Sequence, residues 1–164
     1  MSMGESASTA SNNGASAGTA NRFDEVHLDI HGIDTAVFTA GPAEAAETVV
    51  FFHGAGTATG FDCLLPIAVR RRLVVAHHPG FGASGDPSLG SIGALARHQL
   101  DVLDTLGIER CSIVGHSMGG WTAATLASFS TDRIDKLVLA APAVLDERAD
   151  AVAAISEFLD LDRT

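Results

Sequence analysis

Ser117, which stands between Gly115 and Gly119, is the residue of this 164-residue sequence best suited to covalent chemistry. The apolar run at 111–114 leads into Gly-His-Ser-Met-Gly at 115–119, and helix-forming residues follow. This pattern predicts a nucleophile elbow, a sharp strand-to-helix turn that lifts the Ser117 hydroxyl above the carboxyl edge of a sheet. Side chains in place of the two glycines would collide with the neighbouring strand and helix. The Met118 backbone N–H, at the start of the helix, is suited to binding an oxyanion.

Strands and helices alternate around this motif. After Phe23 the apolar residues Val26, Leu28 and Ile30 alternate with polar ones, and a second run, 33–39, follows Gly32, which predicts an antiparallel hairpin. Buried strands are predicted at 48–52, 73–76, 111–114 and 136–140, and helices at 61–71, 91–107 and 119–130. This alternation predicts an α/β fold with a mostly parallel sheet and helices on both faces.

Polar residues stand at the carboxyl ends of three predicted strands. They are His53-Gly54, His77-His78 and Ser117. Ligands in open α/β sheets bind beyond the carboxyl ends of the strands, so we expect these residues to share one rim.

Three motifs carry a resemblance to a known family. They are F-F-H-G-A-G at 51–56, H-P-G-F-G-A-S at 78–84 and G-H-S-M-G-G at 115–120. In this order they resemble the α/β-hydrolases, over about residues 23–145. The resemblance implies that Ser117 is the catalytic nucleophile and that the backbone N–H groups of Ala55 and Met118 form the oxyanion hole. His77 stands where the family usually has an acidic residue, which is expected to alter loop contacts only.

The family's triad continues in the order Ser, Asp or Glu, then His. The last of the seven histidines here is His116, and none of the carboxylates after Ser117 lies in the context of the family's acid, so none is assigned. We therefore expect an α/β-hydrolase-like fold that is truncated after the sixth strand, corresponding to the family's amino-terminal half. The expected organisation is a disordered tail at 1–21, a partial core at 22–145 and the start of a cap at 146–164.

Most of the seven histidines are expected to have structural roles. His53 is expected to brace the oxyanion loop, and His116 to pack beneath the serine. His77 and His78 lie on the serine's rim and are the remaining candidates for a base, although a structural role is favoured. The others are expected on the polar face of the hairpin, His27 and His31, or in a structural position within a helix, His98.

The charge, hydropathy and cysteine content of the chain bear on its partners and its location. Twenty acidic residues against ten basic ones give a net charge of −10, which disfavours nucleic acid as a partner. No apolar run approaches the roughly 20 residues of a membrane span, and no signal peptide is recognised, so we expect a cytoplasmic protein without membrane contact. Cys63 and Cys111 are expected to be free thiols. No metal-binding spacing occurs, and no cofactor is expected.

The sequence thus predicts a serine hydrolase of a small-molecule acyl substrate, acting on an ester, a thioester or a C–C bond. The open alternative is a non-catalytic hydrolase remnant or small-molecule binding module. The strand at 136–140 is almost entirely apolar, which is typical of a strand with neighbours on both sides. With the expected truncation the second neighbour is missing, so we expect an exposed sheet edge through which the chain self-associates.

Overall fold

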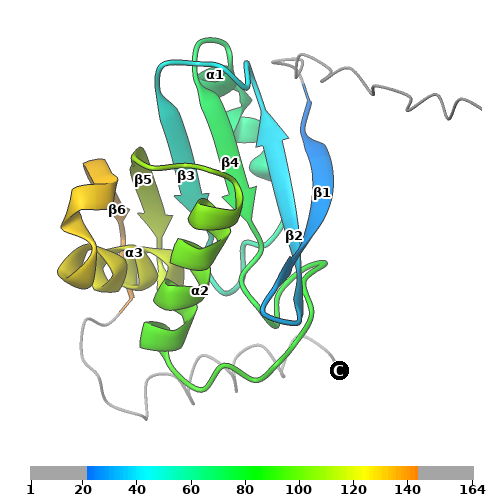
Figure 1. Ribbon diagram of the computed structural model, residues 1–164, viewed down its shortest axis with the longest axis vertical. Coiled ribbons are helices and arrows are strands. Elements are labelled where there is room, and N and C mark those ends of the chain that lie inside the picture. The colour runs from blue at the N-terminus through cyan, green and yellow to red at the C-terminus, as the bar shows by residue number, and fades with distance from the viewer. Residues whose placement is uncertain (1–21, 144–164) are drawn as a thin grey trace, which may run out of the picture.

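The computed structural model describes residues 22–143, which form a six-stranded sheet in the order β1-β2-β4-β3-β5-β6 (Figure 1). Strands β1 (Asp24–Ile30) and β2 (Ile33–Ala40) form the predicted antiparallel hairpin, and β2 pairs antiparallel with β4 (Arg72–Ala76). Strand β3 (Thr48–Phe52) lies parallel to both β4 and β5 (Cys111–His116), and β5 lies parallel to β6 (Ile134–Ala140). The predicted α/β fold with a mostly parallel sheet is confirmed.

Helices cover both faces of this sheet. Helices α2 (Ile92–Thr105) and α3 (Met118–Phe129) lie together on one face, where they close the larger hydrophobic core, and the short α1 (Leu65–Ala68) lies on the other (Figure 1). Alternate strand residues serve the two cores, because successive side chains of a strand point to opposite faces. Val50 and Phe52 of β3 pack beneath α2 and α3, whereas Val49 packs beneath α1.

The single helix predicted over 61–71 is wrong. Residues Phe61–Leu64 form a 3₁₀ turn, η1, and α1 adds one short α-helical stretch that ends at Ala68. Pro66 explains the break, because proline lacks an N–H and its ring clashes with the carbonyl four residues earlier, that of Asp62. A second 3₁₀ turn, η2 (Thr131–Arg133), connects α3 to β6.

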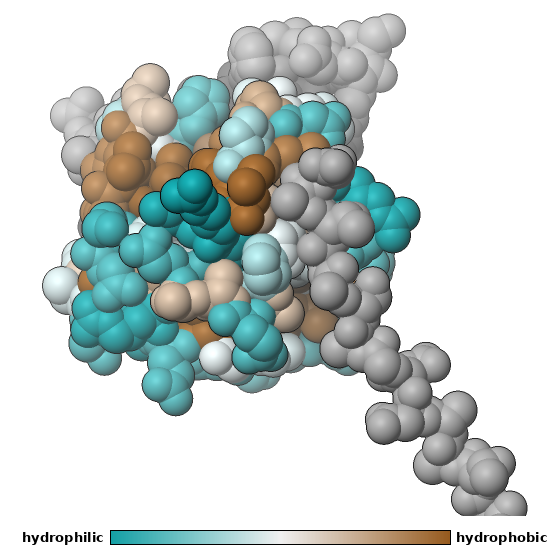
Figure 2. Space-filling model, turned by 90° about the horizontal axis from the view of Figure 1, so that it is seen from above, coloured by the Kyte–Doolittle hydropathy of each residue, from teal (hydrophilic) through white to brown (hydrophobic). Residues whose placement is uncertain are grey.

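Strand β6 forms where predicted but is not buried among the described residues. Within 22–143 only β5 flanks it, and the exposed fractions of Leu137, Val138 and Leu139 are 38%, 52% and 38%. The view from above shows hydrophobic residues exposed among mainly hydrophilic ones (Figure 2). A sequence typical of a strand with two neighbours therefore lies at a sheet edge in this part of the chain.

The remaining expectations concern the two ends of the chain, membrane spans and the cysteines. The tail at 1–21 and the cap segment at 146–164 lie outside the described residues. Across the described part of the chain, no helix is both long and apolar enough to cross a membrane. Cys63 is exposed and Cys111 buried, and both are free thiols as expected.

Candidate active site

The strand-to-helix turn at Ser117 is as tight as its sequence predicts. Strand β5 ends at His116 and α3 begins at Met118, which leaves Ser117 alone between them. Its backbone has φ 52° and ψ −119°, a conformation that L-residues rarely adopt. Such a residue costs about 1–3 kcal/mol and persists only where the surrounding structure enforces it. Here its N–H donates to the Ala140 carbonyl at 3.0 Å, and its carbonyl accepts from the Trp121 N–H at 3.1 Å.

The two glycines of the motif are required by close backbone contacts. A Cβ atom on Gly115 would lie 2.5 Å from the carbonyl oxygen of Gly119. A Cβ atom on Gly119 would overlap the carbonyl oxygen of Phe52 in β3. Only residues without side chains allow α3 to start directly against the ends of β3 and β5.

The loop after β3 packs against this turn. The loop begins with a short turn that two hydrogen bonds close. The Gly54 N–H donates to Thr57 Oγ1 at 2.9 Å, and the Thr57 N–H donates to the Gly54 carbonyl at 3.2 Å. A Cβ atom on Gly54 would lie 3.0 Å from the Cβ of Ser117, so the loop and the serine are in direct contact. Within residues 22–143 the N–H groups of Ala55 and Met118 donate to no other protein atom. The structure therefore brings Ser117 and two free backbone donors to one edge of the sheet.

The side chain of His53 stabilises this loop through hydrogen bonds. It is fully buried, its Nδ1 donates to the Gly54 carbonyl at 2.8 Å, and its Nε2 accepts the His78 N–H at 2.9 Å. Burial lowers the pKa of His53 from 6.5 to about 4, so the ring is neutral at neutral pH with its proton on Nδ1. These contacts are those of the bracing residue that the sequence predicts.

His77 and His78 are engaged in other contacts. His78 Nε2 donates to the His53 carbonyl at 3.2 Å, and His78 Nδ1 accepts from Nε2 of Gln99 at 3.0 Å. His77 Nδ1 accepts the Ala83 N–H at 2.9 Å. Burial lowers the pKa of both imidazoles. Both histidines therefore make contacts within the fold, Nε2 of His77 has no hydrogen-bond partner in the described part of the chain, and neither ring hydrogen-bonds to Ser117.

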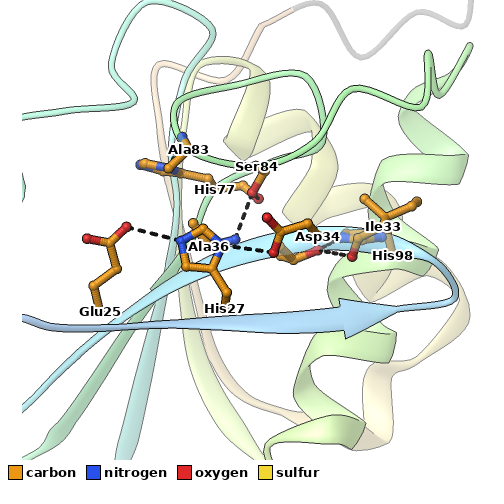
Figure 3. A network of polar contacts seen from close by, with 10 residues as sticks. Glu25, His27, Ile33, Asp34, Ala36, His77, Ala83, Ser84 and His98 are labelled. Atoms are coloured by element: carbon orange, nitrogen blue, oxygen red, sulfur yellow. Dashed lines mark hydrogen bonds and ion pairs between the residues drawn. The ribbon is translucent and has the colours of Figure 1, made fainter.

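The loop at 77–85 is anchored on the hairpin. Ser84 Oγ accepts the Ala36 N–H at 3.0 Å and donates to the His77 carbonyl at 3.1 Å (Figure 3). On the exposed side of the hairpin, His27 lies between Glu25 and Asp34, on the polar face where it is expected. Ser84 lies within a recognised motif, but its contact with β2 depends on the pairing of distant strands and has no signal in the sequence.

All seven histidines lie within the described residues, and none hydrogen-bonds to the Ser117 side chain. His116 Nδ1 lies 3.5 Å from Thr57 Oγ1, and His98 Nε2 lies 3.0 Å from Thr35 Oγ1 in the core. In residues 22–143 no three potential metal ligands gather into a site. The described site thus combines a strained serine with free backbone donors, and no histidine hydrogen-bonds to the Ser117 side chain.

Comparison with known proteins identifies the family. Residues 47–163 match the family described as alpha/beta hydrolase fold. The chain belongs to this family. As an α/β-hydrolase it has curated relatives such as the 2-hydroxy-6-oxononadienedioate/2-hydroxy-6-oxononatrienedioate hydrolase of Cupriavidus pinatubonensis, which is 42% identical over 103 residues, covering 57% of this chain and 35% of that protein.

Other relatives of this α/β-hydrolase differ in activity. The dihydrolipoyllysine-residue acetyltransferase component of the acetoin cleaving system of Cupriavidus necator is 35% identical over 117 residues, covering 70% of this chain and 31% of that protein. A hydrolase from Pseudomonas aeruginosa superposes with a TM-score of 0.67 at 28% identity, covering 73% of this chain and 46% of that one. The chain spans 31% to 42% of the length of the curated relatives it matches.

Proposed function

We propose that this α/β-hydrolase chain carries the nucleophile and the oxyanion site for hydrolysis of a small-molecule carbonyl compound, with Ser117 as the nucleophile. The observation that carries the proposal is the strained backbone of Ser117 beside two N–H groups, of Ala55 and Met118, that donate to no atom in residues 22–143. A strained residue among undersatisfied donors is typical of a site built for a reaction rather than for stability.

In the proposed reaction, Ser117 Oγ attacks the carbonyl carbon of the substrate. The carbonyl oxygen becomes an oxyanion and accepts hydrogen bonds from the Ala55 and Met118 N–H groups. Each such donor typically contributes about 3–4 kcal/mol to transition-state stabilisation. The leaving group then departs, and water hydrolyses the acyl-serine. The substrate class is an ester, a thioester or a vinylogous C–C bond.

The relatives support carbonyl chemistry without selecting a substrate. They include a dienedioate hydrolase and an acetyltransferase component, and the matches cover well under half of each of these proteins. The proposal therefore rests on the geometry around Ser117 and on family membership.

The proton of the Ser117 hydroxyl requires a base that residues 22–143 do not place beside it. The rings of His53 and His78 are fully buried and hydrogen-bonded, and the other histidines contact other residues. We therefore propose that the 164-residue chain by itself is a slow esterase. Triad-deficient enzymes of this type retain roughly 10³–10⁴-fold acceleration over water from oxyanion binding and proximity.

A second candidate function is a non-catalytic binding module that keeps the oxyanion site to hold a carbonyl or carboxylate group. The absence of a hydrogen bond between Ser117 and any of the seven histidines favours it.

Hydrolysis of p-nitrophenyl acetate separates the two candidates. The experiment compares the unchanged chain with Ser117→Ala and with a matched control, Ser128→Ala, whose exposed serine lies at the far end of α3. A hydrolase gives slow turnover above buffer that Ser117→Ala abolishes and Ser128→Ala retains. Equal rates for the unchanged chain and Ser117→Ala would refute the hydrolase and leave the binding module as the remaining candidate. Fast, Ser117-dependent turnover would contradict the claim that no base is in place.

A further inference from the structure

Gln99 is a buried polar residue on the apolar face of α2. Its neighbours along that face are hydrophobic, Leu95, Ala96, Val102 and Leu103, and its own exposed fraction is 0%. Its Nε2 donates to His78 Nδ1 at 3.0 Å, while its Oε1 has no partner in the described part of the chain. A buried unpaired acceptor costs about 1–3 kcal/mol, which an apolar residue of the same size would avoid. The amide of Gln99 therefore has a use other than stability.

The donation from Gln99 selects one tautomer of His78. An imidazole nitrogen that accepts a hydrogen bond carries no proton, so the proton of the neutral His78 ring lies on Nε2. That Nε2–H is the group that donates to the His53 carbonyl at 3.2 Å. The alternative tautomer would set the Nε2 lone pair against the carbonyl oxygen. Gln99 thus supports the contact between His78 and His53.

His78 in turn fixes the ring of His53. The backbone N–H of His78 donates to His53 Nε2 at 2.9 Å, and the two rings lie with their centroids 4.4 Å apart. With Nε2 engaged as an acceptor, the proton of His53 lies on Nδ1, from which it is donated to the Gly54 carbonyl at 2.8 Å. Gln99 therefore supports the carbonyl of His53 through the ring of His78, and the ring of His53 holds the next carbonyl along the chain, that of Gly54.

That carbonyl belongs to the peptide unit that ends in the Ala55 N–H. A trans peptide is planar, and its C=O and N–H point in opposite directions. Holding the Gly54 oxygen toward His53 therefore aims the Ala55 N–H the other way. Because Gly54 lies against Ser117, with its ideal Cβ position 3.0 Å from the serine Cβ, this peptide borders the proposed reaction site.

We propose that Gln99 is a positioning residue that sets the tautomer of His78 and, through the hydrogen bond from His78 Nε2 to the His53 carbonyl, the course of the backbone that leads into the Gly54–Ala55 peptide. The proposal rests on the proposed function of the Ala55 N–H as an oxyanion donor. Gln99 itself touches neither substrate nor reacting atoms.

The test reads the tautomers directly by ¹⁵N NMR of the histidine rings in the full chain. Gln99→Met keeps the volume of the side chain and removes its hydrogen bond, and Leu103→Met is the matched core substitution in the same helix that leaves the hydrogen bonds intact. We expect the unchanged chain and Leu103→Met to show His78 protonated on Nε2 and His53 on Nδ1. In Gln99→Met, His78 should populate the Nδ1–H tautomer, and the Ala55 amide resonance should shift or broaden.

Unchanged tautomers and an unchanged Ala55 resonance in folded Gln99→Met would overturn the proposal. If that variant does not fold, the unchanged chain still decides, because His78 protonated on Nδ1 would contradict the proposed role of Gln99. Labelling of Ser117 by a fluorophosphonate gives a separate reading of the proposed function. With the function and the positioning role both correct, Gln99→Met slows labelling by up to about 10²-fold, the cost of losing one oxyanion donor. Absence of labelling in the unchanged chain would refute the function and leave the tautomer result standing.

Discussion

Acid should destabilise this protein through His53. The ring is fully buried, and its Nε2 is occupied as the acceptor of the His78 N–H, so a proton on Nε2 would remove a hydrogen bond and bury a charge. The pKa of His53 falls from 6.5 to about 4 on folding. Between these two values the unfolded chain binds a proton that the folded chain does not. Stability therefore falls as the pH drops through this window, with no loss above it and the full loss below it.

The expected loss is a sizeable fraction of the stability of a typical domain, about 5–15 kcal/mol. The difference between a pKa of 6.5 and one of about 4 corresponds to about 3 kcal/mol when complete. At pH 5 the unfolded histidine is almost fully charged and the folded one almost neutral, which gives about 2 kcal/mol from His53 alone. Burial also lowers the pKa of His77, His78 and His98, so these three residues add to the loss in acid.

Urea denaturation at pH 7 and pH 5 measures this effect. In His53→Gln the loss between the two pH values should be smaller than in the unchanged chain by about 2 kcal/mol, although the variant is less stable at pH 7. His27→Gln provides the contrast, because hydrogen bonding to Asp34 raises the pKa of His27 and so adds stability on the acid side. Its removal should enlarge the acid loss. The reasoning is refuted if His53→Gln loses as much stability as the unchanged chain.

Three further substitutions test the fold around the site. Gly119→Ala should lower the free energy of unfolding by about 1–3 kcal/mol, measured by urea denaturation, because its methyl group would meet the Phe52 carbonyl; an unchanged value would refute the steric argument. Ser91→Ala should cost about 1 kcal/mol by the same assay, since Ser91 Oγ accepts the Ala94 N–H at the start of α2. Val138→Lys should reduce the self-association that we propose for the β6 edge, measured by sedimentation velocity; a chain that is monomeric before substitution would contradict that proposal.

Elements with a strong local pattern could be predicted from the sequence. Strand β3 occupies the predicted residues because a continuous β-branched and aromatic run has few alternatives, and α2 begins at its Ser91 cap as expected. The helix predicted over 61–71 is wrong because Pro66 interrupts an apolar spacing that otherwise favours a helix. The burial of β6 depends on which strands flank it, and its own sequence does not carry that information.

Some residues of the candidate site could likewise be predicted from the sequence, and others could not. Ser117 and its glycines could be predicted because the turn imposes local steric demands that the residue types record. Gln99 was missed, although a lone polar residue at a core position of an amphipathic helix was a usable signal. Its partner could not be predicted, because His78 lies 21 residues earlier in the chain and the two meet only when α2 packs on the sheet.

The most direct test of Ser117 as the nucleophile is the site of its covalent adduct. The full chain is treated with a fluorophosphonate, and intact-mass and peptide-mapping mass spectrometry then identify the modified residue. We expect a single adduct, on Ser117. It should form at least about tenfold faster than on any other serine, because the Ala55 and Met118 N–H groups stabilise the developing charge. Adducts spread over several serines at similar rates, or unchanged labelling in Ser117→Ala, would contradict it.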